Sequence, residues 1–215
     1  MRMKRMMAAL LAAAMVMGSA LTATAAATSS TKDGDTSSVV DPNSNDHTGN
    51  TVTSDVKNGT ATVTKCTSDG SDEGKAVEFK VAEDPATKQK VDITVIGDGK
   101  KGVFDSKAGR KVTSMNVNSA ASTVTIKKNA LKGSKIKTIK VATKKLVVKK
   151  GAFNKTKQKK IVIKFVGKKS GALTVKKGSL KGLTKITVKG LSKKEFKKVK
   201  KKLQKAGFKG TIKKG

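Results

Sequence analysis

Three windows of the sequence share one pattern: residues 124–133 read VTIKKNALKG, residues 147–155 read VVKKGAFNK and residues 174–182 read TVKKGSLKG. In each window an aliphatic residue is followed by two lysines, then Asn or Gly, then a small residue and a large apolar one. The aligned aliphatic residues are Ile126, Val148 and Val175, which lie 22 and 27 residues apart. Periods of this length indicate stacked units that bury their apolar edges together.

A run with apolar residues at alternate positions follows each window, at residues 136–141, 160–163 and 183–188. Alternation of this kind is typical of β-strands. Three further runs with the same period occur earlier, at residues 60–65, 76–81 and 91–96. We therefore expect a mainly β protein: a short leucine-rich-repeat-like β-solenoid with an N-terminal β segment and a C-terminal capping α-helix.

The end of the chain carries the sequence features of such a cap. Ser192 and Glu195 have the spacing of a capping box, and Leu191 and Phe196 occupy the positions of a hydrophobic staple. Gly207 stands where a left-handed helix end is expected. The helix between them is lysine-rich on one face and apolar on the other. Docking on the last unit and binding at a membrane surface are the two interpretations, and we favour docking.

The composition changes abruptly along the chain and divides it into five parts. A positive start, an apolar run and small residues are typical of a secretory signal peptide. Ser, Thr, Asp and Asn then dominate a stretch with little to bury, which predicts a disordered linker. The expected parts are a signal peptide at 1–27, a linker at 28–57, an acidic β-rich segment at 58–105, a basic repeat array at 106–190 and a cap at 191–215.

The formal charge of +33 is carried by one half of the protein. Residues 28–105 hold nine lysines against 14 acids, whereas residues 106–215 hold 36 Lys and Arg against a single acid, Glu195. A separation of this kind indicates a basic surface that meets a polyanion, or a heavily solvated exterior. Both interpretations remain open from the sequence.

Stacking of the units would place equivalent lysines about 4.8 Å apart, the separation of neighbouring strands. Like charges at that distance repel, and a bound polyanion would relieve the repulsion and release counterions. A polyanionic cell-wall polymer, an acidic glycan or a host or bacterial surface protein is the expected partner. The candidate polyanion-binding residues are Lys127, Lys128, Lys149, Lys150, Lys176, Lys177, Lys160 and Lys185.

The Lys149-Lys-Gly-Ala-Phe153 sequence, with its variants at 129–131 and 178–180, resembles bacterial secreted leucine-rich repeat proteins of the BspA-like type. The resemblance covers roughly residues 91–215. It implies a secreted or cell-surface protein of a Gram-positive bacterium with an adhesion or interaction role, in a family whose members usually have no known ligand. The Cys that commonly follows Ala-Phe in that family is absent here.

The sequence also bears on other classes of function. One His and one Cys cannot form a zinc site of His and Cys ligands, so we expect no metal, no cofactor and no catalytic residues. The alternatives are a non-specific nucleic-acid-binding protein and, less favoured, an enzyme of the cell envelope. Because Arg110 is the only Arg beyond the signal peptide, specific base recognition is not expected. We expect a monomer without a transmembrane segment in the mature chain.

Overall fold

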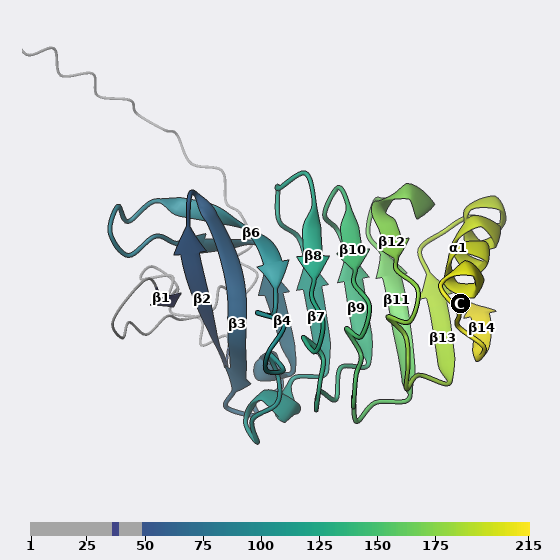
Figure 1. Cartoon of the computed structure of the whole chain (residues 1–215), viewed down its shortest axis with the longest axis horizontal. Coiled ribbons are helices and arrows are strands. Elements are labelled where there is room, and N and C mark those ends of the chain that lie inside the picture. Colours follow the sequence, from purple (N-terminus) through teal and green to yellow (C-terminus); the bar gives the residue numbers. More distant parts are fainter. Residues whose placement is uncertain (1–35, 39–48) are drawn as a thin grey trace, which may run out of the picture.

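The computed structural model describes residues 36–38 and 49–215 of the chain. The signal peptide expected at 1–27 and most of the linker expected at 28–57 lie outside the described residues. Within the described residues, the strands form two sheets that face each other, and they follow one another along the long axis of the molecule (Figure 1).

The first sheet contains eight strands and the second contains six. In the first sheet the order is β1 (Thr36–Ser38), β2 (Asn50–Lys57), β3 (Thr60–Ser68), β6 (Lys90–Ile96), β8 (Val124–Ile126), β10 (Leu146–Val148) and β12 (Leu173–Val175), with β5 (Val81–Glu83) paired to β6. In the second sheet it is β14 (Thr211–Lys214), β13 (Lys185–Lys189), β11 (Lys160–Phe165), β9 (Thr138–Val141), β7 (Ser114–Val117) and β4 (Ala76–Phe79).

Most of the strand pairs are parallel. The antiparallel pairs are β1 with β2, β2 with β3, and β5 with β6. From β6 to β13 the chain alternates between the two sheets, so that each successive unit supplies one strand to each sheet. The last strand, β14, follows β13 in the second sheet. The register agrees with the alignment of the sequence windows, because Val148 of β10 lies opposite both Ile126 and Val175.

The expected fold class is wrong. Instead of a mainly β, leucine-rich-repeat-like solenoid, the chain is a mixed α/β structure with two mostly parallel sheets and one C-terminal helix, α1 (Lys193–Lys205). Alternating apolar residues mark a strand and its buried face, but they do not say to which sheet the strand belongs. The windows and the runs that follow them therefore belong to different sheets, a division that the period of the sequence could not show.

The N-terminal boundaries also differ from those expected. Residues 50–57, which we assigned to the linker, form strand β2, where Val52 and Val56 are buried. Pairing with β3 buries these two side chains, and this burial compensates the ordering of a segment rich in Thr and Ser. The strands of the acidic segment at 58–105 belong to the same two sheets as those of the basic part.

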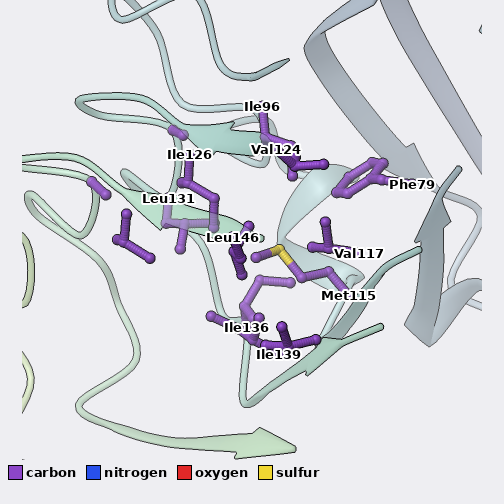
Figure 2. Packing of buried hydrophobic residues seen from close by; sticks show 14 of the residues in the cluster. Phe79, Ile96, Met115, Val117, Val124, Ile126, Leu131, Ile136, Ile139 and Leu146 are labelled. Carbon is purple, nitrogen blue, oxygen red and sulfur yellow. The ribbon is translucent and has the colours of Figure 1, made fainter. Parts of the chain in front are cut away.

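The core lies between the sheets and is filled by aliphatic side chains from both of them. Figure 2 shows these side chains pointing toward one another. Burying one such side chain contributes about 1.5–3 kcal/mol. Residues of the first sheet in this cluster include Val124, Ile126 and Leu146, and those of the second include Met115, Val117 and Ile139.

Short 3-10 turns and the C-terminal helix complete the two layers. The turns are η1 (Glu73–Lys75), η2 (Gly109–Lys111) and η3 (Ser170–Ala172). Helix α1 contacts η3 and β12, at the C-terminal end of the first sheet (Figure 1). Its buried residues, Val199 and Leu203, are those of the expected apolar face.

Both ends of α1 have the expected capping residues. The Ser192 side chain accepts a hydrogen bond from the backbone N–H of Glu195 at 3.3 Å, which confirms the N-cap. At the other end Gly207 has a φ of +83°. The Phe208 N–H donates to the Leu203 carbonyl at 3.1 Å and the Gly207 N–H to the Gln204 carbonyl at 2.8 Å, the paired bonds of a Schellman motif. Leu191 and Phe196 of the expected staple both pack against the core.

Candidate anion-binding surface

The first column of expected lysines follows the strands of the first sheet. Lys127, Lys149 and Lys176 come directly after β8, β10 and β12. The backbone ladder continues through them, because the Lys149 N–H donates to the Ile126 carbonyl at 3.0 Å and the Lys176 N–H to the Val148 carbonyl at 2.9 Å. The three lysines therefore occupy equivalent places in successive units. Lys149 and Lys176 are exposed and Lys127 is half-buried.

The second column, Lys128, Lys150 and Lys177, is exposed throughout. The aliphatic part of Lys128 lies against Gly151, and that of Lys150 lies against Gly178, which in each case is the glycine of the next unit. A Cβ placed on Gly151 would lie 3.3 Å from Cγ of Lys128, and one on Gly178 would lie 3.6 Å from Cγ of Lys150. The apolar part of a lysine can pack in this way while its ammonium remains in water.

Lysines also oppose lysines directly in the second sheet. Lys160 of β11 pairs with Lys185 of β13, as the sequence predicts. In a second row Lys164 lies opposite both Lys140 and Lys189. Like charges directly opposite each other in a sheet are unfavourable. Lys140 is the member of this second row that lies nearest to the N-terminus.

The lysine row of the second sheet ends at a carboxylate. Along this row Lys140 lies opposite Asn116, and Asn116 lies opposite Glu78. The side-chain amides of Asn116 and Asn118 donate to Oε1 of Glu78 at 2.6 and 2.8 Å. The Glu78 carboxylate at the N-terminal end of the row therefore has partners within the protein, whereas Oδ1 of Asn116 is buried without a hydrogen-bond partner among the described residues.

Few of the lysines have acidic partners. Within the described part of the chain, only Lys132 and Lys198 among the lysines beyond residue 111 lie within 4.0 Å of a carboxylate side chain. Lys132 is 3.8 Å from Asp105, and Lys198 is 2.8 Å from Glu195. The remaining positive charge on this part of the surface is balanced by solvent ions or by a ligand.

The lysine-rich surface is hollowed where the chain passes from the first sheet to the second. The hollow has a volume of about 520 Å³ and is open to solvent. Its residues come from the turns of three successive units. They are Asn129, Lys132, Asn154, Lys155, Thr156, Lys159, Lys181 and Gly182.

The four lysines of this hollow were not among the expected site residues. Lys132 and Lys181 directly follow the large apolar residue of their sequence windows, which is the one sequence feature that could have pointed to them. Lys155 and Lys159 belong to the unit between. Whether these four lysines meet around one hollow depends on how far each turn projects from the sheets, which the sequence pattern does not predict.

Two of the side chains that line the hollow are amides, and they are hydrogen-bonded to each other. The Asn154 amide donates to the side-chain oxygen of Asn129 at 3.1 Å, and the Asn129 amide donates to the carbonyl of Gly99 at 3.1 Å. This chain of hydrogen bonds runs across three units and holds both side chains in place. The hollow is therefore lined by two hydrogen-bonded amides and by the side chains of four lysines.

Lys155 has a backbone conformation that is uncommon for a lysine. Its φ is +50°, whereas the equivalent residues of the neighbouring units are Gly133, with a φ of +71°, and Gly182, with a φ of +99°. Glycine adopts this left-handed region without the penalty that a Cβ brings. A lysine there costs about 1 kcal/mol of backbone strain relative to glycine.

Glu195 departs from the expected capping box. Its carboxylate accepts hydrogen bonds from Lys198 at 2.8 Å, from the Ser170 hydroxyl, and from the Ser170 N–H at 2.8 Å. These bonds lower the pKa of Glu195 to about 2. The Lys202 ammonium donates to the carbonyls of Ser170 and Leu173 at 2.7 and 3.0 Å, and burial lowers the pKa of Lys202. The two side chains fasten α1 to η3 and β12.

Cys66 lies in the core and not at the surface. It is a free cysteine with none of its area exposed, and burial raises the pKa of its thiol. Reactivity requires a thiolate, so this environment keeps the thiol inert. The described residues include no group of three or more His, Cys, Asp or Glu side chains placed to hold a metal ion.

Comparison with known proteins finds no matching protein family, no matching curated protein and no matching solved structure. No helix in the described part of the chain has the length and apolar character needed to cross a membrane. The arrangement of the charges is therefore the basis for an inference about function.

Proposed function

We propose that this protein is an exported, non-catalytic interaction protein whose lysine-rich surface binds polyanionic polymers. The observation that carries the proposal is the register of the second sheet, where Lys164 lies between Lys140 and Lys189 and Lys160 faces Lys185. Each of these pairs raises the free energy of the unbound protein. An anionic polymer laid along the rows lowers it and releases the polymer's counterions.

The expected partner is a polymer of the cell envelope or an acidic glycan. Lysine ammonium groups act as point charges, so they bind phosphate, sulfate and carboxylate polymers without reading a sequence of bases or sugars. DNA of any sequence should therefore bind by the same charges. A strong preference for one DNA sequence would contradict the proposal.

Retention on immobilised heparin and on teichoic acid, eluted with a salt gradient, tests the proposal. The double variant Lys164→Gln with Lys189→Gln, which removes two exposed charges from the row that carries the proposal, should elute at lower salt than the unaltered protein. The matched control is Lys88→Gln with Lys90→Gln, which removes the same charge from exposed positions in the acidic part of the chain. The proposal fails if the unaltered protein is not retained at low salt, or if both double variants elute together.

The proposed location is the outside of a Gram-positive cell, as the leader-like start of the sequence and the resemblance to secreted leucine-rich repeat proteins imply. Fractionation of a culture into medium, wall and cytoplasm tests this part. Release of the protein from the wall by salt alone supports retention by charge. Recovery in the cytoplasm would contradict export.

A further inference from the structure

We infer that the hollow around Lys155 is a discrete subsite for one phosphate or sulfate ester group of the bound polymer, held by Lys155 together with Lys159 and Lys181. The inference rests on the proposed binding of polyanions and adds to it a defined position and ligand class. This position is a hollow lined by the turns of three successive units, whereas the lysine rows lie on the strands of the second sheet.

The first support is the backbone of Lys155. Its left-handed conformation is shared with Gly133 and Gly182, so glycine would satisfy the fold at this position as it does in the two neighbouring units. Steric crowding does not explain the glycine at position 182, because a Cβ there would lie 3.7 Å or more from its neighbours. Lys155 therefore has a strained backbone conformation where the neighbouring units have glycine, and its side chain lines the hollow.

The second support is the set of donors. Lys155, Lys159 and Lys181 are exposed at the hollow and lie farther than 4.0 Å from every carboxylate side chain in the described residues, whereas Lys132 is partly neutralised by Asp105. The fixed amide of Asn154 adds a polar group to the floor. Several donors arranged around a concavity suit an anion that accepts hydrogen bonds in more than two directions, as a tetrahedral ester does.

The third support is size. A volume of about 520 Å³ exceeds the needs of a single ion. It falls within the range of about 300–1,000 Å³ that is usual for sites of small organic ligands. The hollow therefore has room for the ester group and for the sugar or polyol unit that carries it.

The decisive experiment compares Lys155→Gly with Lys88→Gly. Lys88 is also an exposed lysine in the left-handed region, with a φ of +58°, but it belongs to the acidic part of the chain. Both variants lose one charge and relieve one strained residue, so both should unfold at the same temperature as the unaltered protein or higher. Only Lys155→Gly should weaken the binding of the polymer.

Binding is measured by isothermal titration calorimetry at several salt concentrations. The probes are a glycerol-phosphate oligomer, a heparin hexasaccharide with sulfate esters, and a hyaluronan oligosaccharide that carries only carboxylates. Lys155→Gly should reduce the affinity for the first two by about threefold to tenfold, and should reduce the salt dependence by about one ion. Lys155→Arg, which retains the charge, should remain within twofold of the unaltered protein.

The outcomes separate this inference from the proposed function. If the unaltered protein binds the polymers but Lys155→Gly and Lys88→Gly lose equal affinity, only net charge matters, and the subsite is wrong while the surface proposal stands. If hyaluronan binds as tightly as the other probes and depends equally on Lys155, the ester class is wrong. If no probe binds at low salt, both proposals fail.

Discussion

The two ends of one row in the second sheet show how the same backbone can carry opposite surfaces. At the N-terminal end, Glu78 accepts hydrogen bonds from Asn116 and Asn118. At the C-terminal end, Lys164 lies between Lys140 and Lys189. The strands are parallel and in register throughout. The difference is that the carboxylate at one end accepts hydrogen bonds from neighbouring amides, whereas at the other end lysines face lysines.

The first sheet makes the contrast sharper. In its outward row Val95, Thr125, Val147 and Thr174 lie opposite one another, and none of them is charged. At β8, β10 and β12 the lysines come only after the strands end. The positive charge is therefore concentrated on the second sheet and on the turns that lead into it.

The largest effect should come from the core, where the acidic and the basic parts of the chain are alike. Phe79 of the acidic part and Phe153 of the basic part are almost completely buried. Replacing either with alanine should lower the free energy of unfolding by about 3–5 kcal/mol, because each change leaves a cavity. Urea unfolding followed by circular dichroism measures this.

Val166→Ala serves as the control, since Val166 is 43% exposed and its truncation should change stability by less than about 0.5 kcal/mol. A cost below about 1 kcal/mol for one of the two phenylalanines would show that its part of the chain does not share the continuous core.

The next largest effect should come from the acidic end of the row. Glu78→Ala removes the acceptor of two hydrogen bonds and leaves the amides of Asn116 and Asn118 without it. A loss of about 1–3 kcal/mol is expected. Removal of the exposed Glu73 should have little effect. Equal results for the two glutamates would mean that the Glu78 hydrogen bonds contribute nothing to stability.

A smaller effect of opposite sign is expected at the basic end. Lys164→Gln removes a charge from between two like charges, so it should raise the free energy of unfolding by about 0.2–1 kcal/mol at low salt. The gain should vanish at 1 M NaCl, where charges are screened beyond about 3 Å. The control is Lys88→Gln. The Lys88 ammonium is not part of the row and lies 3.9 Å from the Glu83 carboxylate, so its removal should not stabilise the protein. Destabilisation by Lys164→Gln at low salt would contradict repulsion within the row.

The smallest effect concerns the single acid of the basic half, Glu195. Hydrogen bonds from Lys198 and Ser170 lower its pKa from 4.5 to about 2. The carboxylate therefore stabilises the fold above about pH 4.5, and this contribution is lost progressively as the pH falls toward 2. Carbon NMR of the carboxyl group should show a midpoint near 2, which Ser170→Ala should raise. A midpoint near 4.5 would show that Glu195 is not tied to η3.

Much of the local structure follows from the sequence because it depends on short spacings. The windows at Ile126, Val148 and Val175 predict the register of β8, β10 and β12, since strands of one sheet align their buried residues. Ser192 and Gly207 predict the ends of α1, since a cap needs one acceptor and one left-handed residue. These features are decided within a few residues of chain.

The parts that the sequence did not reveal all depend on contacts between distant segments. Residues 50–57 look like a linker, but β2 is ordered by pairing with β3 and by the burial of Val52 and Val56. Glu195 has the spacing of a capping box, but Ser170, 25 residues earlier, supplies donors to its carboxylate. A local sequence pattern does not predict which distant group will bond to the Glu195 carboxylate.

By itself, the sequence determined where the strands of the three repeated windows and the ends of the helix lie, and it placed the positive charge in the C-terminal half. Only the tertiary structure divided the strands between two sheets and brought Lys155, Lys159 and Lys181 around one hollow. The physical reason is that side-chain alternation and turn residues act through the local backbone. The convergence of side chains about 26 residues apart is decided by how successive units stack.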